Sequence, residues 1–384
     1  MEDVVDKFID YRGKTPRKSQ LGIPLITAKI VKDGRILEPN EFIAEEDYEE
    51  WMTRGYPEIN DVVLTTEAPL GEVALIKDKR VALAQRIITL QTKKNLCDPV
   101  FLKYYLQGNE GQAALQSRAS GSTVEGIKSA LLKKMEIYLP PLPEQRAIAA
   151  VLSSLDDKID LLHRQNATLE AMAEALFRQW FVVEAREEWE TVKVGRFVKT
   201  NQRTVTKDYP FREIEYLDTS SLNKGMVTSI QNIELVNAPS RAKRLVQNND
   251  ILISTVRPDQ KHYGIIRKPS ERLVVSTGFC VITCIDIDPH FIYLLLTTED
   301  MTEYLHSIAE GSTSTYPSLK PHDIEEIEFA LPPKALISRF GELASSYWDK
   351  IHSNQIQIRT LTALRDTLLP KLMSGEVRVK MENH

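Results

Sequence analysis

The chain has 384 residues, of which 42% are hydrophobic, so it is long enough for two or three domains with buried cores. It carries a formal net charge of −5 and only three cysteines, an odd number that argues against a disulfide framework. We find neither an apolar run of membrane-spanning length nor a signal peptide at Met1, so we expect a soluble, cytoplasmic protein.

Residues 1–138 are predicted to form a mixed α/β domain. Asp98-Pro99 precedes a helical run, Val100–Leu106, and the loop Ser120–Thr123 precedes a strand-like segment, Met135–Leu139. Glycines and prolines separate apolar runs of strand length as turns. These predicted strands cover residues 23–30, 62–66, 73–76 and 86–90.

A long helix is predicted within residues 139–185. Pro140, Pro141 and Pro143 suit a helix entrance, where backbone amides have no intrahelical partner. An apolar stripe follows with alternating spacings of four and three, the a/d pattern of a coiled-coil seam. At 1.5 Å per residue the helix is about 60 Å long and needs a partner helix. Its seam residues are Ile148, Leu152, Leu155, Ile159, Leu162, Asn166, Leu169, Ala173, Leu176 and Trp180.

Residues 186–330 repeat the order of the first domain. Asn249-Asp250 corresponds to Asn60-Asp61, and Asp288-Pro289 corresponds to Asp98-Pro99, at offsets of 189 and 190 residues. Gly311-Ser312-Thr313 likewise corresponds to Gly121-Ser122-Thr123. These pairs indicate an internal duplication.

The duplication continues in residues 331–384, where a second long helix and a C-terminal tail are predicted. Leu331-Pro332-Pro333 repeats Leu139-Pro140-Pro141 after 192 residues. The stripe shifted by this offset has polar exceptions at Asn354 and Arg365. Its members are Phe340, Ala344, Tyr347, Ile351, Asn354, Ile358, Leu361, Arg365, Leu368 and Leu372.

The two seams predict a register for the helix pair. If the helices are antiparallel with their ends level, Ile148 faces Leu372 and Trp180 faces Phe340. The same register pairs Asn166 with Asn354. Because buried amides need hydrogen-bond partners, we predict that these two side chains meet in one layer of the seam.

The second domain opens with Trp189–Val194, a segment that has no counterpart in the first half. After a helix stop at Ser374-Gly375, Val377-Arg378-Val379 alternates like a short edge strand. Antiparallel helices return the C-terminus to the start of the first domain. We therefore predict that Glu376–Lys380 packs there, in the place that Trp189–Val194 holds in the second domain, giving circular pseudo-two-fold symmetry.

Charge is distributed unevenly along the chain. Residues 12–37 contain seven Lys/Arg and one acid, and residues 190–272 contain fifteen Lys/Arg and nine acids. Residues 273–330 contain one basic residue and ten acids. Basic, turn-rich segments at equivalent places in two repeats favour nucleic-acid binding, although a solvated surface explains the charge alone equally well.

Motifs for catalysis or metal binding are weak. No aromatic-flanked Asn/Asp-Pro-Pro-Tyr methylation motif is present, and Phe8 stands where a P-loop ending at Gly13-Lys14-Thr15 needs glycine. Pro258-Asp259 lacks the acidic-x-Lys partner of a nuclease. Cys280 and Cys284 lie in a β-branched run that indicates a buried strand rather than a zinc site with His262 and His290. We predict no catalytic residues and no metal.

The chain resembles the specificity (S) subunit of type I restriction–modification enzymes over essentially all 384 residues. The most specific match is PLPEQRAIAAVLSSLDDKIDLLHRQNATLEAMAEALF in the first long helix. Further matches are GKTPRK, IPLITAKIVKDG, NDVVLTTEAPLGEVALI and AQRIITL in the first half, and GSTSTYPSLKPHDIEEIEFALPP and LTALRDTLLPKLMSGE in the second.

The resemblance implies an α+β fold in which two target-recognition domains in tandem repeat are separated by two long antiparallel helices. Each domain would read one half of a bipartite site in double-stranded DNA. The chain would be non-catalytic and hold no cofactor. It would recruit two modification (M) subunits, which bind S-adenosylmethionine and methylate adenine. Restriction (R) subunits, which use ATP and Mg, would join through the M complex.

Candidate DNA contacts come from the basic segments and the glycine–serine loops, because Arg and Lys bind phosphates and Arg, Asn and Gln read base edges. In the first domain the candidates are Lys14, Arg17, Lys18, Lys29, Lys32, Arg35, Ser122 and Thr123. In the second they are Arg203, Lys207, Arg241, Lys243, Arg244, Arg257, Lys261, His262, Tyr263, Ser312, Thr313, Ser314 and Tyr316.

Two other classes of protein are compatible with parts of the pattern. A scaffold that binds proteins rather than DNA would explain the repeat and the acidic total, but not the matching basic clusters. A self-contained nuclease or methyltransferase would lack its motifs. Affinity for duplex DNA that falls steeply with salt distinguishes the DNA-binding interpretation from the scaffold.

Overall fold

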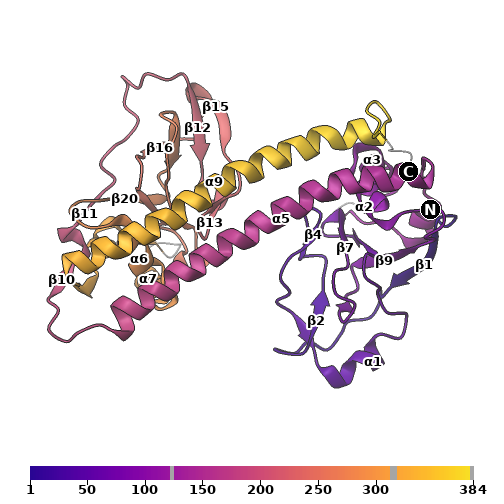
Figure 1. Cartoon of the computed structure of the whole chain (residues 1–384), viewed down its shortest axis with the longest axis horizontal. Coiled ribbons are helices and arrows are strands. Elements are labelled where there is room, and N and C mark those ends of the chain that lie inside the picture. Colours follow the sequence, from indigo (N-terminus) through magenta and orange to yellow (C-terminus); the bar gives the residue numbers. More distant parts are fainter. Residues whose placement is uncertain (122–124, 312–317, 381–384) are drawn as a thin grey trace. The chain divides into compact units, whose positions relative to one another are not determined.

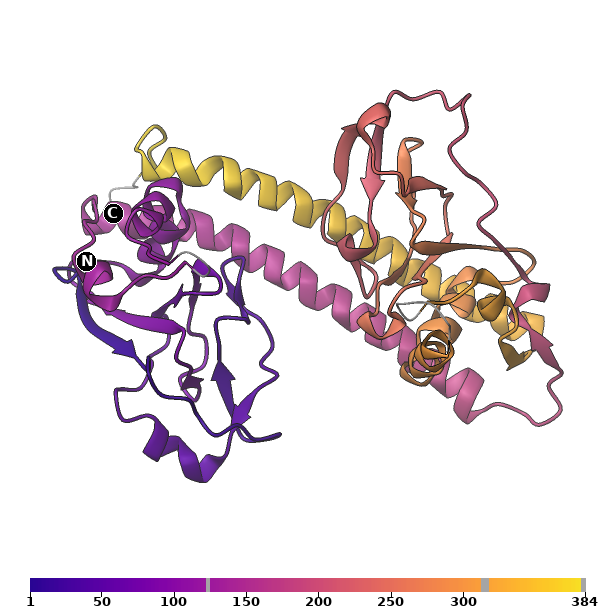
Figure 2. The ribbon, with the colours of Figure 1, turned by 180° about the vertical axis from the view of Figure 1, so that it is seen from behind.

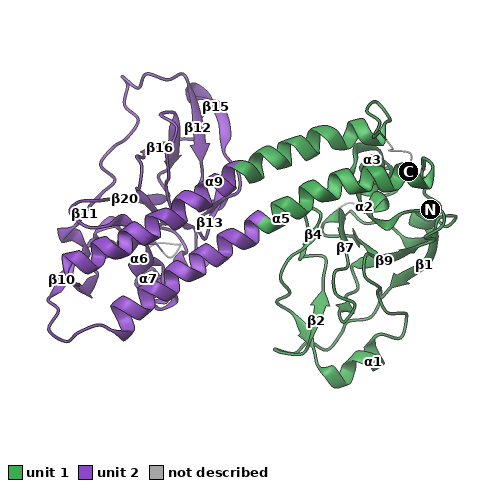
Figure 3. Ribbon diagram, viewed as in Figure 1, with its two compact units in different colours: residues 1–161, 357–384 green, residues 162–356 purple. Residues whose placement is uncertain are grey.

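The computed structural model describes residues 1–121, 125–311 and 318–380. The chain divides into two compact units, which are described separately (Figures 1 and 3). Unit 1 comprises residues 1–161 and 357–384, and unit 2 comprises residues 162–356. Two long helices, α5 (Leu142–Arg178) and α9 (Lys334–Met373), run through both units. The remainder of each unit combines small sheets with short helices, so the predicted α+β fold is confirmed.

In unit 1, one sheet has the antiparallel order β1-β9-β6-β7, and a second has the order β5-β2-β8 with β2 and β8 parallel. Short helices α1 (Tyr48–Trp51), α2 (Pro99–Gln107), α3 (Asn109–Gln116) and α4 (Ser129–Lys133) connect and cover the strands. The strands are β1 (Val5–Asp10), β2 (Ile23–Ile26), β3 (Val31–Lys32), β4 (Arg35–Ile36), β5 (Phe42–Ile43), β6 (Val62–Thr66), β7 (Leu70–Leu75), β8 (Ala82–Leu83) and β9 (Ile87–Thr92).

In unit 2, the corresponding sheets have the orders β11-β20-β17-β18 and β15-β12-β19-β16, and β10 pairs separately with β21. The helices are α6 (Pro289–Thr297), α7 (Glu299–Glu310) and α8 (Pro321–Glu325). The strands are β10 (Thr191–Lys193), β11 (Val198–Thr200), β12 (Glu213–Leu217), β13 (Leu222–Asn223), β14 (Met226–Val227), β15 (Gln231–Glu234), β16 (Ala242–Leu245), β17 (Ile251–Ser254), β18 (Tyr263–Ile265), β19 (Leu273–Ser276), β20 (Phe279–Cys284) and β21 (Glu328–Ala330).

Equivalent residues make the same local structures in the two units, which confirms the internal repeat. Asn60 and Asn249 both have a left-handed backbone, with φ of 70° and 69°. The carboxylate of the next residue closes the turn, because Asp61 accepts a hydrogen bond from the Glu58 amide and Asp250 accepts one from the Gln247 amide. Aspartate also begins the equivalent helices, since Asp98 caps α2 and Asp288 caps α6.

The C-terminal tail departs from its predicted structure. Val379 is half-buried against the core of unit 1, as expected, but residues 376–380 form no strand, and neither does the predicted strand Met135–Leu139. The amino terminus of Met1 and the amide of Glu2 donate to the carbonyls of Met135 and Lys133. The start of the chain therefore lies against residues 133–135. In unit 2, by contrast, β10 pairs with β21.

Within each unit, α5 and α9 lie side by side and antiparallel (Figures 1 and 2). The predicted asparagine layer is confirmed in unit 2, where Asn354 Nδ2 donates to Asn166 Oδ1 at 2.8 Å. Both side chains are buried, with exposed fractions of 0% and 9%. In the same register the rings of Trp180 and Phe340 pack edge to face, with centroids 6.2 Å apart.

Every seam candidate is at least half-buried. The fully buried members are Ile148, Leu152, Ile159, Leu162, Asn166, Ala173, Phe340, Ala344, Ile351, Asn354 and Leu372. The half-buried members are Leu155, Leu169, Leu176, Trp180, Tyr347, Ile358, Leu361, Arg365 and Leu368. Trp180 lies in a π-helical turn, Gln179–Val183, that continues α5. The apolar stripes therefore form the inner faces of the helix pair.

The asparagine layer leads to a stability prediction. Replacing one partner, in Asn354→Leu, leaves the buried Asn166 amide without its hydrogen bond. We expect the free energy of unfolding to fall by about 1–3 kcal/mol, measured by urea unfolding followed by circular dichroism. The matched change Gln357→Leu, at an exposed position of the same helix, should have little effect. Equal stabilities of the two variants would show that the amide pair does not matter.

Candidate nucleic-acid interface

The loop after β1 in unit 1 carries exposed basic side chains, and hydrogen bonds hold the backbone at its start. Arg54 Nη1 donates to the carbonyl oxygens of Asp10 and Arg12 at 2.6 and 2.9 Å, which holds the two ends of this backbone segment. Beyond it, Lys14 and Arg17 are exposed, and neither forms an ion pair with the described residues. The sequence analysis did not select Arg54, because it lies outside the basic segment and supports the loop from elsewhere in the chain.

A second exposed pair lies near the β3–β4 hairpin. Lys29 precedes β3 and Lys32 ends it, and both side chains are exposed. The tight turn that follows has positive φ at Asp33 and Gly34, as a two-residue hairpin requires. The Asp33 amide donates to Glu72 Oε2 at 2.9 Å, which fixes the hairpin against β7. The described part of unit 1 thus presents cations from two anchored turns.

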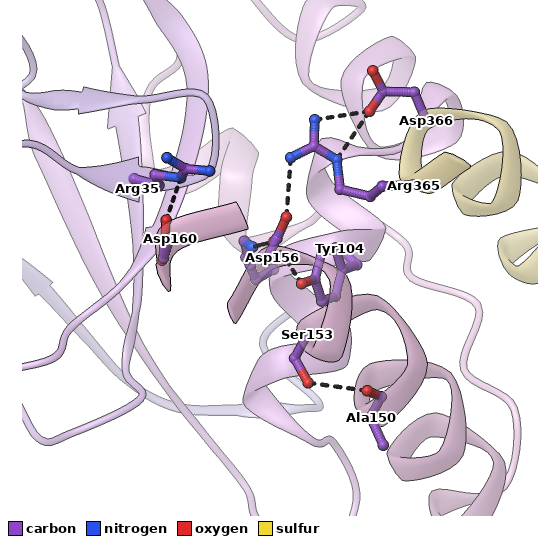
Figure 4. A network of polar contacts seen from close by, with 9 residues as sticks. Arg35, Tyr104, Ala150, Ser153, Asp156, Asp160, Arg365 and Asp366 are labelled. Atoms are coloured by element: carbon purple, nitrogen blue, oxygen red, sulfur yellow. Dashed lines mark hydrogen bonds and ion pairs between the residues drawn. The ribbon is translucent and has the colours of Figure 1, made fainter. Parts of the chain in front are cut away.

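Two unit 1 candidates are engaged by carboxylates. Lys18 pairs with Glu41 at 2.7 Å but keeps half of its side chain exposed. Arg35 turns toward the long helix, where its Nε lies 2.8 Å from Asp160 Oδ1 (Figure 4). We therefore assign Arg35 a role in attaching the hairpin to α5 rather than in binding phosphates.

In unit 2 the structure brings together cations that the sequence separates. The amide of Val205 donates to the Lys243 carbonyl at 2.8 Å, and the Leu245 amide donates to the Arg203 carbonyl at 3.0 Å. Residues 203–205 therefore lie along β16. Four exposed cations belong to these two adjacent segments and their ends, and none of them forms an ion pair within the described chain. They are Arg203, Lys207, Arg241 and Lys243. The fifth candidate here, Arg244, is half-buried.

The turn between β17 and β18 exposes only part of its candidate DNA-binding side chains. Arg257 is exposed and has a left-handed backbone. Lys261 pairs with Glu299 at 2.5 Å, and His262 Nδ1 lies 2.7 Å from the Leu222 carbonyl oxygen. The ring of Tyr263 packs inward, and burial raises its pKa to about 12. Lys261, His262 and Tyr263 therefore contact other residues of unit 2.

The glycine–serine loops are attached at equivalent places in the two units. The amide of Ile127 donates to the Thr66 carbonyl at 3.0 Å, and the Leu319 amide donates to the Thr255 carbonyl at 2.7 Å. The described residues that follow each loop therefore lie beside the end of the equivalent strands β6 and β17. The remaining candidates, Ser122, Thr123, Ser312, Thr313, Ser314 and Tyr316, lie outside the described residues.

A buried ion network holds the body of unit 1 to both long helices (Figure 4). Asp156 Oδ2 on α5 accepts hydrogen bonds from Lys103 Nζ and the Tyr104 hydroxyl of α2, each at 2.6 Å. Its Oδ1 accepts one at 3.0 Å from Arg365 of α9, which also binds Asp366. Burial alone would raise the pKa of Asp156, but these cations and donors outweigh it and lower the pKa. One residue in the sequence indicated this network, since Arg365 interrupts the apolar stripe of the predicted seam.

Metal-ligating side chains do not gather in the described part of the chain. Among residues 1–121, 125–311 and 318–380, no cluster of three or more His, Cys, Asp or Glu side chains could hold a metal ion. Cys280 lies on the buried strand β20, as predicted, and burial raises the pKa of its thiol to about 12. In the same ranges, none of the helices has the length and apolarity needed to cross a membrane. The exposed features suit binding.

Comparisons with known proteins agree on one family. The model of the type I restriction modification DNA specificity domain matches residues 2–171 and 186–339. The type I restriction enzyme MjaIX specificity subunit of Methanocaldococcus jannaschii is 27% identical over 363 residues, which cover 88% of this chain and 82% of that protein. The HindI specificity subunit of Haemophilus influenzae is 23% identical over 374 residues, covering 77% and 81% of the two chains.

A solved structure has the same fold. The type I restriction–modification S subunit of M. genitalium aligns with a TM-score of 0.59, covering 99% of this chain and 95% of its own. Its sequence is 17% identical, so this likeness supports the fold alone. The two matched segments of the family model correspond to the two repeats of the chain.

The ion network gives a second stability prediction. Asp156→Asn leaves the buried Lys103 ammonium without its counter-charge, so we expect a loss of about 3–5 kcal/mol at neutral pH. The exposed neighbour gives the matched control, Asp157→Asn, which should change little. Because the folded pKa of Asp156 is lowered, its contribution is complete above a pH of about 4 and is lost as the pH falls further. Chemical unfolding at several pH values measures both effects.

The exposed cations beside β16 give a prediction for DNA binding. Arg203→Ala with Lys243→Ala removes two side chains that are free to bind phosphates. We expect weaker binding of the full chain to duplex DNA and a salt dependence shallower by about 0.9 per lost contact in log K against log salt. Lys334→Ala, an exposed change at the start of α9, is the control. An unchanged salt slope in the double variant would place the DNA elsewhere.

Proposed function

Because the chain belongs to the family of type I restriction–modification DNA specificity subunits, we propose that each unit reads one half of a bipartite site in double-stranded DNA. The observation that carries this proposal is the repetition of one binding framework. Both units contain a four-stranded sheet of equivalent strand order, and in both a residue after the glycine–serine segment, Ile127 or Leu319, bonds beside the end of the equivalent strand, β6 or β17. Both units also expose basic side chains. Two units of similar fold but different sequence suit the recognition of two different half-sites.

Phosphate contacts would position each unit, and base contacts would give its specificity. In unit 1, Lys14, Arg17, Lys29 and Lys32 are the exposed cations available for this purpose. In unit 2, the four exposed cations beside β16 are available. Arg35, His262 and Tyr263 support the framework through contacts inside their own units.

The long helices would set the distance between the half-sites and would recruit two M subunits. Each helix is close to 40 residues long and keeps one apolar face against its partner helix. Other apolar side chains on the same helices remain exposed, which suits packing against further helices. In unit 1 these are Leu161 and Leu364, and in unit 2 they are Met172, Leu343 and Ile356.

This chain would contribute recognition and leave the chemistry to its partners. The M subunits would bind S-adenosylmethionine and transfer its methyl group to adenine within the site. R subunits, joined through the M complex, would use ATP and Mg. The described side chains offer DNA-binding cations and a helical framework, which fits this division of labour.

Methylation-site mapping tests the assignment of one unit to each half-site. Residues 1–138 are exchanged for the corresponding segment of another family member, and the chain is expressed in cells with its M subunit. We expect one half-site to change, while the other half-site and the number of base pairs between them stay the same, because the second unit and both helices are unaltered.

The parent chain expressed with the same M subunit is the control for this exchange. A change in both half-sites would contradict independent reading by the two units. A change in the gap would contradict the role of the helices in setting the distance. No methylation by the parent chain would disfavour DNA recognition itself and support a protein-binding scaffold.

A further inference from the structure

Unit 2 contains a cavity of about 580 Å³ beside helix α5. Its walls combine two carboxylates of α5, Glu170 and Glu174, with the rings of Tyr263, Tyr293 and Trp348. All of these residues belong to unit 2. DNA recognition as proposed above makes no use of this cavity.

Two polar groups in the cavity lack partners. Glu170 is half-buried, and its carboxylate has no hydrogen bond or ion pair with the described residues. Burial and the neighbouring Glu174 raise its pKa to about 7, against the opposing effect of Lys224. Tyr293 is only 6% exposed, and its hydroxyl makes no hydrogen bond within the described chain.

The other charges around the cavity do not neutralise Glu170. Lys261 forms its ion pair with Glu299 at 2.5 Å, and Lys224 is an exposed side chain that makes no ion pair with the described residues. Arg178 and Asp300 also line the cavity and carry opposite charges. A carboxylate and a phenol hydroxyl therefore face a hollow that also presents aromatic rings.

The Tyr293 hydroxyl and Glu170 both lie close to Gly225, in the turn between β13 and β14. A Cβ atom at Gly225 would lie 3.4 Å from the Tyr293 hydroxyl and 3.5 Å from Glu170 Oε1. The equivalent residue of unit 1 is Gly34, where a Cβ atom would lie 3.4 Å from Lys103 Nζ. Tyr293 in unit 2 thus occupies the position that Lys103 holds in unit 1.

Unit 1 fills the equivalent place with cations of its own. There Lys103 and Arg365 meet on Asp156 (Figure 4). At offsets of 190 and 192 residues, the counterparts in unit 2 are Tyr293 for Lys103, Ala173 for Arg365 and Trp348 for Asp156. Both cations are therefore missing from unit 2. One acidic residue is present in both units, since Glu174 of unit 2 corresponds to Asp366 of unit 1. Glu170 is a further acid in unit 2 that has no acidic counterpart in unit 1.

We propose that this cavity binds the guanidinium or ammonium end of an alkyl chain supplied from outside the protein. The Glu170 carboxylate would accept charge-assisted hydrogen bonds from the cation, and the aromatic walls would attract it through their ring faces. A free alkyl cation and a Lys or Arg side chain of a bound subunit share this chemistry. The inference does not depend on DNA recognition.

Calorimetric titration of the full chain with n-butylguanidinium chloride tests the proposal, with neutral n-butylurea as the matched probe. We expect the cation to bind and the urea not to bind. Glu170→Gln should weaken binding of the cation at least tenfold, whereas Glu170→Asp, which keeps the charge, should retain part of it. Glu303→Gln, on an exposed part of α7 outside the cavity, is the control and should bind as the parent does.

A graft provides an independent variant. Tyr293→Lys places an ammonium group where unit 1 has Lys103, so it should abolish binding of butylguanidinium, with folding checked by circular dichroism. Repeating the titration with the M subunit bound distinguishes the two sources. Lost binding would point to a side chain of that subunit, and retained binding would point to a free cation. No binding to the full chain alone, or equal binding to Glu170→Gln, overturns the proposal.

Discussion

The antiparallel pairing of α5 with α9 is the interaction on which the rest of the structure depends. Two amphipathic helices of nearly 40 residues cannot leave their apolar faces in water, so within each unit they bury these faces against each other. The seam is apolar along most of its length, and an apolar seam can slide by a heptad at little cost. The hydrogen bond between Asn166 and Asn354 penalises such a shift, because the shifted amides would be buried without partners.

The two units attach to this helix pair by different means, although they arose from one repeat. Unit 1 uses charge, with Asp156 receiving Lys103, Tyr104 and Arg365. Unit 2 uses aromatic packing at the same place, with Tyr293 and Trp348 packed edge to face at 5.5 Å. The hydrogen bonds of an ion network require fixed positions of donor and acceptor atoms, whereas packed aromatic rings tolerate a wider range of geometries. Both of these rings line the cavity in unit 2.

The basic residues fall into two groups, because some side chains are exposed and could bind DNA, whereas others pair with groups inside the fold. Cations that read DNA must remain hydrated until DNA arrives, and those that anchor a turn must find a carboxylate or carbonyl within the fold. Lys243 and Arg203 meet the first requirement because they are exposed, and Arg35 and Lys261 meet the second because each pairs with a carboxylate. The charge of a segment therefore indicates where binding can occur, but the fold selects which side chains take part. This selection differs between the two units even where the backbone repeats.

Local and periodic features could be predicted from the sequence. The heptad spacing determined both long helices and their register, and the repeated Asn-Asp and Asp-Pro pairs determined equivalent turns and helix starts, because each depends on residues near in sequence. The tertiary structure alone decided the rest. Residues 135–139 form no strand because no described segment pairs with them as β10 pairs with β21 in unit 2, and Arg35 leaves the candidate interface because Asp160, distant in sequence, lies beside it. Such contacts join segments whose proximity no local pattern records, so they could be assigned only from the folded chain.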